Sequence, residues 1–144
     1  MKVSFVYYSN TGHTSSVAAE AAKRLESIGV ETTQIDVVRD EDKEVPTDVD
    51  GMVFMTPVNA FSLPQQMTDF FATCPSFKPG TPAVVFVNQG LWTPVLGGNR
   101  TARQLTDAVQ ALGCDVKDVT IVSWNKKRVP KIDAFLSRLT EVFS

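Results

Sequence analysis

The feature that most constrains the fold is a regular alternation between short apolar runs and stretches in which apolar residues recur at helical spacing. The apolar runs are rich in β-branched and aromatic residues and predict five strands, at 2–8, 31–38, 51–56, 81–87 and 115–123. The helical patterns predict four helices, at 13–28, 64–72, 99–112 and 130–143. The connection at 39–50 is too polar for a core, so we expect a loop there with at most one exposed helical turn.

Strands separated by helices pair in parallel through right-handed crossovers, which predicts an α/β fold with a doubly wound, five-stranded parallel sheet. Helices would then cover both faces of the sheet in a three-layer α/β/α sandwich. The runs at 51–56 and 81–87 are continuously apolar, as expected for strands that are buried on both faces. The chain has 144 residues and no linker-like segment, so we expect a single domain over 1–144.

Composition excludes several classes of protein. Two cysteines and one histidine cannot supply a disulfide framework, an iron–sulfur cluster or an ordinary zinc site. No apolar run approaches the ~18–20 residues of a membrane span, and the N-terminal segment turns polar too early for a secretory signal. We therefore expect a cytoplasmic protein without a membrane partner, in which Cys74 and Cys114 are structural rather than redox-active.

The formal net charge of −2 is unevenly distributed along the chain. Acidic residues concentrate in 36–50, and basic residues concentrate in 126–131. Neither sign dominates enough to predict a nucleic-acid groove. The acids at 40–50 are interpreted as a solvated face, and the basic segment as a solvated turn before the last helix. The alternative for the basic segment is a docking point for an acidic redox partner.

Ligands of an open parallel sheet bind beyond the carboxyl ends of the strands, where the strand order switches, and three loops (9–14, 57–63 and 88–98) follow such ends. The first loop places hydroxyls, an amide and a glycine at the start of a helix, where free N–H groups and the helix dipole favour a phosphate. The phosphate-binding candidates are Ser9, Asn10, Thr11, Gly12, His13 and Thr14. The alternative is a turn with a helix N-cap, in which His13 is an exposed first-turn residue.

Other known phosphate loops are excluded by what this loop lacks. It has neither the Gly-x-x-x-x-Gly-Lys of a P-loop nor the Gly-x-Gly-x-x-Gly of a dinucleotide site. It also lacks the acids that a response-regulator receiver needs to hold magnesium. Because no Lys or Arg is present, neutral donors and the helix dipole would have to bind a phosphate of charge roughly −2.

Residues 8–14, Tyr-Ser-Asn-Thr-Gly-His-Thr, resemble the phosphate loop of the flavodoxin family, Ser/Thr-x-Thr-Gly-x-Thr. The resemblance covers essentially the whole chain and implies a flavodoxin-like fold with FMN as the cofactor. Residues 56–64, with Met67 and Phe70-Phe71, look most like a flavodoxin-like domain that some anaerobe proteins fuse to a ferredoxin module. The cysteines for that module are missing, so the chain would correspond to the flavin half alone.

The resemblance also assigns roles to the second and third loops, which sandwich the flat isoalloxazine ring in flavodoxin-like sites. Phe61 and Trp92 are the stacking candidates. The alternatives are that Phe61 packs under the next helix and that Trp92 caps the sheet. Asn59 is a candidate for a peptide flip beside the ring, because asparagine tolerates positive φ. The remaining ring-binding candidates are Pro57, Val58, Ala60, Asn88, Gln89, Gly90 and Gly97.

The sequence departs from the family pattern in two ways. Most flavodoxins are strongly acidic, whereas this chain has a net charge of −2, so we do not expect a partner surface built wholly on negative charge. The segment 91–98 is long, apolar and hinged by two glycines. It is interpreted as a gate over the flavin or a partner contact, with a plain flexible loop as the alternative.

Taken together, the resemblance and the three loops imply an FMN-binding electron carrier rather than a turnover enzyme. Such a protein shuttles low-potential electrons between redox proteins such as a reductase, a ferredoxin or an acceptor enzyme, with the flavin supplying the chemistry. No side chain is assigned as an acid, a base, a nucleophile or a metal ligand. Two alternatives remain open: an FMN-dependent NAD(P)H or quinone reductase, and a cofactor-free binding module.

Overall fold

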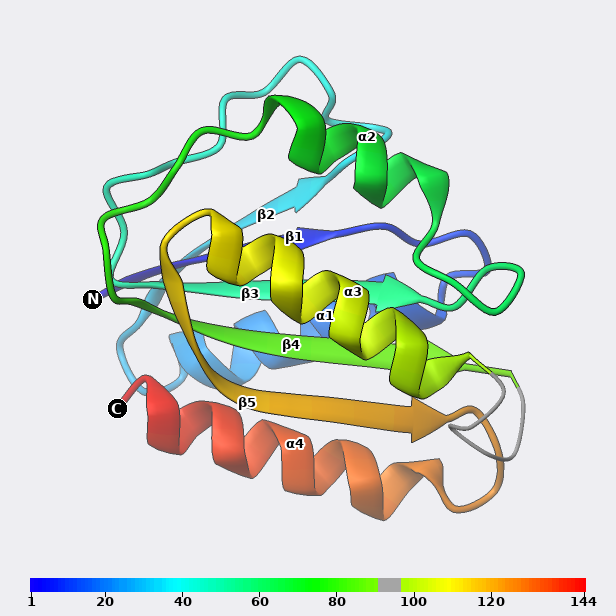
Figure 1. Cartoon of the computed structure of the whole chain (residues 1–144). Helices are drawn as coiled ribbons and strands as arrows, with labels where there is room; N and C mark the ends of the chain where they lie inside the picture. The colour runs from blue at the N-terminus through cyan, green and yellow to red at the C-terminus, as the bar shows by residue number, and fades with distance from the viewer. Residues whose placement is uncertain (91–96) are drawn as a thin grey trace.

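The computed structural model describes residues 1–90 and 97–144. Over these residues, strands and helices alternate in the order that the sequence predicts (Figure 1). The elements are β1 (Lys2–Tyr7), α1 (His13–Glu26), β2 (Glu31–Asp36), β3 (Gly51–Pro57), α2 (Gln65–Thr73), β4 (Thr81–Gln89), α3 (Gly98–Ala111), β5 (Cys114–Ser123) and α4 (Arg128–Val142).

The strands form one parallel sheet in the order β2-β1-β3-β4-β5, which confirms the predicted doubly wound topology. Strand β1 pairs with β2 on one side and with β3 on the other, so that Val3 lies between Thr32 and Gly51. The direction of winding reverses between β2 and β3, and the switch point therefore lies between the carboxyl ends of β1 and β3.

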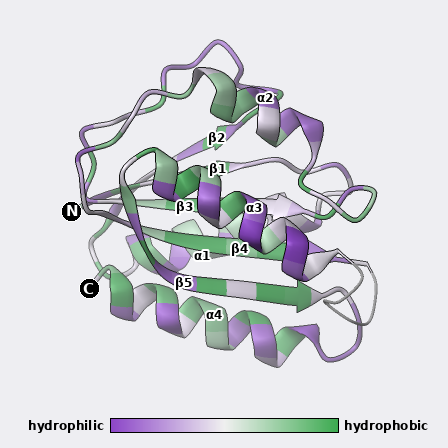
Figure 2. Ribbon diagram, viewed as in Figure 1, coloured by the Kyte–Doolittle hydropathy of each residue, from purple (hydrophilic) through white to green (hydrophobic). Residues whose placement is uncertain are grey.

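Two helices cover each face of the sheet (Figure 1). The core between the sheet and the pair α1 and α4 contains every apolar position that helical spacing predicted for these helices. Those positions are Val17, Ala18, Ala21, Ala22, Leu25, Ile132, Phe135, Leu136, Leu139 and Phe143. The opposite core lies under α2 and α3 and includes Met67, Leu105 and Val109. Because both faces are covered, β3 is buried at every residue, and β4 is drawn mostly in the green of hydrophobic residues in Figure 2.

Several element boundaries differ from the predicted ones for local reasons. Helix α1 ends at Glu26 because a tight turn follows it, in which Gly29 has a φ of +88°. Helix α4 begins before Pro130, since proline is tolerated within the first helical turn. Strand β4 continues to Gln89 because its last two residues still pair with neighbouring strands. Residues 37–42 form turns, and the N–H of Asp40 donates to the Asp36 carbonyl at 2.8 Å, so this region is a loop with a single helix-like turn, as expected.

The close packing of Phe143 against the backbone of Gly51 in the core could not be predicted from the sequence. Gly51 opens β3 beneath the end of α4, where a Cβ atom would overlap the ring of Phe143. Glycine at this position lets the last aromatic side chain of the chain close the core, and any larger residue would displace it. In the described parts of the chain, no helix is long and apolar enough to cross a membrane.

Candidate functional site at the carboxyl edge of the sheet

The predicted loops meet because β1, β3 and β4 are neighbours in the sheet and all end at the same edge, on the right in Figure 1. The hydroxyl of Thr14, at the start of α1, donates a buried hydrogen bond to the Asn88 side chain of β4. The N–H of Val58 donates to the backbone carbonyl of Asn88 at 3.1 Å. These contacts bring residues that are 74 positions apart in the sequence into one cluster.

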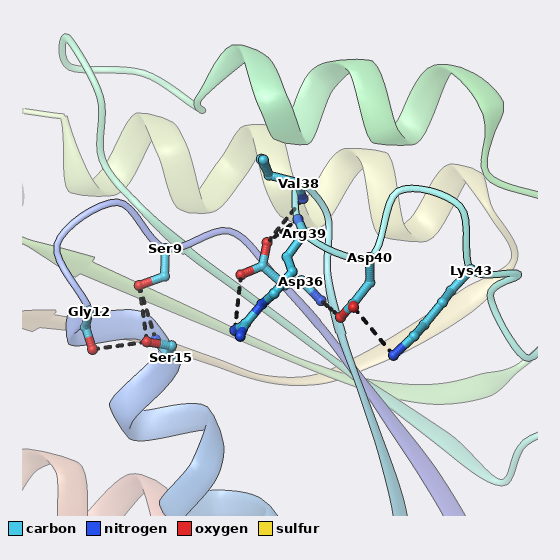
Figure 3. A network of polar contacts seen from close by, with 8 residues as sticks. All are labelled: Ser9, Gly12, Ser15, Asp36, Val38, Arg39, Asp40 and Lys43. Atoms are coloured by element: carbon cyan, nitrogen blue, oxygen red, sulfur yellow. Dashed lines mark hydrogen bonds and ion pairs between the residues drawn. The ribbon is translucent and has the colours of Figure 1, made fainter.

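We call residues 9–14 the α1 loop. Its turn depends on Gly12, which is the N-cap of α1 and has a φ of +89°. Any residue with a Cβ would be strained in this backbone conformation. The Ser9 hydroxyl oxygen accepts a hydrogen bond from the backbone N–H of Ser15 at 3.2 Å, and the Ser15 hydroxyl donates to the Gly12 carbonyl at 3.1 Å (Figure 3). The loop is thus held by its serines, while Asn10, Thr11 and Gly12 are exposed.

The backbone N–H groups of the α1 loop are the donors best suited to an anion. Among the residues that the structure describes, the N–H groups of residues 10–14 donate to no protein acceptor. They lie at the positive end of α1, where backbone groups are left without helical partners. The Thr11 hydroxyl is exposed and, within the described chain, has no hydrogen-bond partner, whereas the Thr14 hydroxyl is engaged with Asn88. This donor set fits a phosphate group that is bound by neutral hydrogen bonds.

The second loop is a tight two-residue hairpin. Asn59 and Ser62 exchange two backbone hydrogen bonds of 2.9 Å, with Ala60 and Phe61 at the tip. Both tip residues have positive φ, 48° for Ala60 and 62° for Phe61, as in a type I′ turn. Asn59 itself does not have a positive φ in this structure, and the peptide flip at Asn59 stays a prediction. The hairpin register places the left-handed conformation on the next two residues, at a cost of roughly 1–2 kcal/mol each for residues with a Cβ.

Phe61 points away from the core, with 57% of its surface exposed. The alternative that this ring packs under α2 is therefore wrong. Gly97 braces the hairpin from behind: it has a φ of +116°, and a Cβ there would lie 2.7 Å from the Phe61 Cα and 2.9 Å from the Val58 Cγ1. The absence of a side chain at Gly97 allows the start of α3 to support the hairpin, and the Phe61 ring is left facing solvent at the edge of the sheet.

The third loop begins with two buried residues of β4. Asn88 and Gln89 are each 3% exposed. The Gln89 side-chain N–H group donates to the Ser123 hydroxyl at 2.9 Å, and the Gln89 backbone carbonyl accepts from the N–H of Trp124 at 2.7 Å. These two residues thus join β4 to its neighbours, while Gly90 is exposed beyond them. Trp92 and the rest of 91–96 lie outside the described residues. The stacking role of Trp92 and the interpretation of 91–98 as a gate or partner contact therefore stay predictions.

Sequence reasoning missed the aromatic residue at the end of β5. The Trp124 indole stacks on the imidazole of His13, with ring centroids 4.1 Å apart and planes 10° apart. The guanidinium carbon of Arg128 lies 5.0 Å from the same indole centroid. His13 is accordingly half-buried rather than exposed. The available signal was the position of Trp124, directly after a strand that ends at the same edge as the other loops.

The acids at 40–50 are mostly exposed, as predicted for a solvated face, but Asp36 and Asp40 at the start of the acidic segment hold the backbone after β2. We call residues 36–43 the β2 loop. The Asp36 carboxylate accepts hydrogen bonds from the N–H groups of Val38 and Arg39, and the Asp40 carboxylate accepts one from the N–H of Asp36 (Figure 3). The bond from Asp36 and the nearby Lys43 ammonium group lower the pKa of Asp40. Burial and the Asp36 charge raise the pKa of Tyr7.

Two further features lie away from the three loops. A cavity of about 300 Å³ between the β2 loop and α2 is lined by Val37, Asp40, Phe70 and others, but by none of the predicted site residues. Burial raises the pKa of the Cys74 and Cys114 thiols to about 11, which keeps both protonated at neutral pH and supports a structural role.

Comparison with known proteins points to one family. The family model described as flavodoxin matches residues 5–120. Oxidised flavodoxin 1 from Bacillus cereus is 19% identical, with a TM-score of 0.75 and 98% of each chain covered. Two-electron reduced flavodoxin from Megasphaera elsdenii is 17% identical, with a TM-score of 0.76, and the alignment covers 96% of this chain and 98% of that one. A search of curated protein sequences finds no match.

Proposed function

The chain belongs to the flavodoxin family, whose members bind FMN and transfer electrons to redox partners, and we propose that it carries low-potential electrons between redox proteins. The observation that best supports this proposal is the α1 loop, where N–H groups without protein acceptors lie on the same sheet edge as the exposed Phe61 ring. The α1 loop suits a phosphate, and the hairpin that carries Phe61, which follows the adjacent strand β3, suits a flat aromatic ring.

We propose that the α1 loop holds the FMN phosphate. The N–H groups of residues 10–14 and the Thr11 hydroxyl would donate to the phosphate oxygens. The positive end of the α1 dipole would stabilise the charge without a Lys or Arg in the loop. Ser9 and Thr14 would act indirectly, because their hydroxyls fix the loop to Ser15 and to Asn88. Thr11 is therefore the side chain that we expect to matter most for phosphate affinity.

We propose that Phe61 stacks on one face of the isoalloxazine ring, with the backbone of Asn59, Ala60 and Gly90 near its polar edge. Bound FMN supplies the redox chemistry, since its ring accepts and releases electrons. The electron-rich face of Phe61 disfavours added negative charge on the ring, and would therefore lower the affinity for reduced FMN relative to oxidised FMN. The strained hairpin tip and the brace at Gly97 would hold the Phe61 ring in position.

The partner class is part of the same proposal. A reductase or ferredoxin as electron donor, and an enzyme as acceptor, would approach the exposed loops at the carboxyl edge. This edge has carboxylates at Asp36 and Asp40 on one side and basic residues at 126–128 on the other. A partner would meet both signs of charge, and the rate of association should depend less on ionic strength than for a uniformly acidic surface.

FMN titration of the purified chain, followed by its visible absorbance, tests the proposal. The wild-type chain should bind FMN with a perturbed flavin spectrum, and Thr11→Val should weaken binding about tenfold through loss of one charge-assisted hydrogen bond. Thr73→Val is the matched control, because Thr73 is exposed at the end of α2, outside the α1 loop. Failure of the wild-type chain to bind FMN would contradict the assignment. Rapid NAD(P)H oxidation by the loaded protein would favour a reductase instead.

A further inference from the structure

Resting on the proposed function, this inference concerns the charge of the phosphate. The α1 loop contains no Lys or Arg, whereas the FMN phosphate carries roughly two negative charges at neutral pH. Hydrogen bonds from neutral donors leave part of this charge uncompensated. A cation that is held near the loop by other parts of the fold would add to the affinity for FMN without contacting the phosphate.

The structure places such a cation beside the α1 loop. Arg128 is the first residue of α4, and its guanidinium carbon lies 5.0 Å from the Trp124 ring centroid. The same indole stacks at 4.1 Å on His13, which directly follows the Gly12 N-cap. The two stacking distances keep the guanidinium within about one Debye length, ~10 Å at 0.1 M salt, of the His13 ring. We call His13, Trp124 and Arg128 the aromatic–cation column.

Hydrogen bonds hold the backbone at Trp124 and the side chain of Arg128. The backbone N–H of Trp124 donates to the Gln89 carbonyl at 2.7 Å, which ties the main chain at Trp124 to the end of β4, while the indole itself is held between His13 and Arg128. The Arg128 guanidinium donates to the Asn125 carbonyl at 2.9 Å, and the Asn125 side chain accepts the N–H of Lys127 at 2.8 Å. Fixed geometry matters because a freely moving arginine would lose entropy on binding, whereas a held one would not.

The charge of the column is not neutralised nearby. Residues 124–131 contain Lys126, Lys127, Arg128 and Lys131 and no acidic residue. None of these four cations forms an ion pair with any residue in the described parts of the chain, although Arg39, Lys43, Lys117 and Arg138 do. A guanidinium that is stacked on an indole also keeps its positive charge at any ordinary pH.

We propose that Trp124 and Arg128 are positioning residues for FMN: they hold a permanent positive charge beside the α1 loop and make binding selective for the phosphorylated flavin. His13 transmits this arrangement to the loop, because its ring forms the contact between α1 and the indole. The expected signature is an effect on FMN that riboflavin, which lacks the phosphate, does not show.

The experiment compares FMN with riboflavin as ligands for four proteins: wild type, Arg128→Met, Arg128→Lys and Lys131→Met. Arg128→Met should raise the FMN dissociation constant about three- to tenfold at low salt, as expected for loss of one cation near a helix N-terminal anion site. Its riboflavin dissociation constant should be unchanged, and the FMN effect should shrink at 0.5 M salt. Arg128→Lys keeps the charge but loses the planar guanidinium that the indole and the Asn125 carbonyl hold, so its FMN dissociation constant should lie between those of wild type and Arg128→Met.

Lys131→Met is the matched control, since it removes a cation from the same segment, one that lies beside Val119, Thr120 and Arg138. It should leave both ligands unaffected. An unchanged FMN dissociation constant in Arg128→Met, an equal loss for riboflavin, or an equal loss in Lys131→Met would overturn the role of the column while wild-type FMN binding stands. Wild-type protein that binds neither ligand would overturn the proposed function as well.

Discussion

The α1 loop and the β2 loop follow adjacent strands at the same edge of the sheet, yet they satisfy their backbone in opposite ways (Figure 3). In the β2 loop, Asp36 and Asp40 supply carboxylates that accept the N–H groups of the loop itself. In the α1 loop, the N–H groups of residues 10–14 have no acceptor among the described residues. The β2 loop pairs its N–H groups with its own carboxylates, whereas the α1 loop supplies no carboxylate for its N–H groups.

The difference shows how the same sheet edge serves two purposes. A loop whose N–H groups are already paired with a carboxylate gains little from a ligand, because the ligand must first displace that carboxylate. A loop at the positive end of a helix, with donors that lack a partner, gains hydrogen bonds from any anion that fits it. The loop that lacks an acid is therefore the one that can bind an anion. Adding a carboxylate to the α1 loop should abolish its anion binding.

The largest expected effect comes from giving the α1 loop its own carboxylate. Thr11→Asp would place a negative charge where the phosphate is proposed to bind, so FMN affinity should fall at least about 100-fold through like-charge repulsion and loss of free donors. The thermal stability of the protein without FMN should be unchanged or higher, because a carboxylate near a helix N-terminus is favourable.

Isothermal titration with FMN and a thermal melt measure the two quantities. Thr11→Asn is the control, since it has nearly the same shape without the charge and should lose far less affinity. Equal losses in Thr11→Asp and Thr11→Asn would mean that the charge at this position is irrelevant, and the contrast between the loops would then not explain binding.

The next effect separates backbone strain from ligand binding. Gly12 and Gly29 have nearly identical φ angles, +89° and +88°, and a Cβ at either position meets no atom within 4 Å. Alanine at either glycine should therefore destabilise the fold by a similar ~1 kcal/mol, owing to the left-handed backbone. Only Gly12→Ala should also weaken FMN binding, by about tenfold. A comparable loss of FMN affinity in Gly29→Ala would show that strain alone, rather than the α1 loop, controls binding.

The sequence predicted the architecture well because the architecture depends on local periodicity. All nine elements follow from apolar spacing, and the buried face of α1 was predicted residue by residue. The position of the three loops also followed, since the carboxyl ends of parallel strands meet at one edge. The phosphate-binding role of residues 9–14 was inferred from the order of residue types alone and stays a prediction.

Features that depend on the exact backbone conformation of a loop, or on contacts between distant segments, were not predictable. The positive φ at Ala60 and Phe61 follows from the register of a hairpin and not from any preference of these residues. The stack of His13 on Trp124 joins positions far apart in the sequence, and neither residue type by itself predicts such a contact. Asp40 was interpreted as part of a solvated charge run, because its hydrogen bond from the Asp36 N–H forms only when the chain turns after β2.

A third effect removes an acid from the β2 loop. Asp36→Ala deletes the acceptor of the Val38 and Arg39 N–H groups, so we expect a loss of about 1–2 kcal/mol in the free energy of unfolding. FMN affinity should stay within about twofold of wild type, because this loop is not proposed to bind the ligand. Asp42→Ala is the control: Asp42 is an exposed acid of the same loop and should leave both quantities unchanged. A large loss of FMN affinity in Asp36→Ala would mean that the loops act as one site.

The smallest effect is a dependence of stability on pH that arises from Asp40. Its pKa is lowered from the ordinary value of 3.8, first by the hydrogen bond from the Asp36 N–H and then by Lys43, so the folded protein favours the ionised carboxylate. The resulting stabilisation is present above the pKa of the unfolded chain and is lost as the pH falls through the lower pKa of the folded state. Wild type should therefore melt slightly above Asp40→Asn at pH 6, and the difference should shrink as the pH falls below 3.8 and through the lower pKa of the folded state. A difference that persists unchanged in acid would show that shape, and not charge, stabilises the β2 loop, and the comparison with the α1 loop would lose its electrostatic basis.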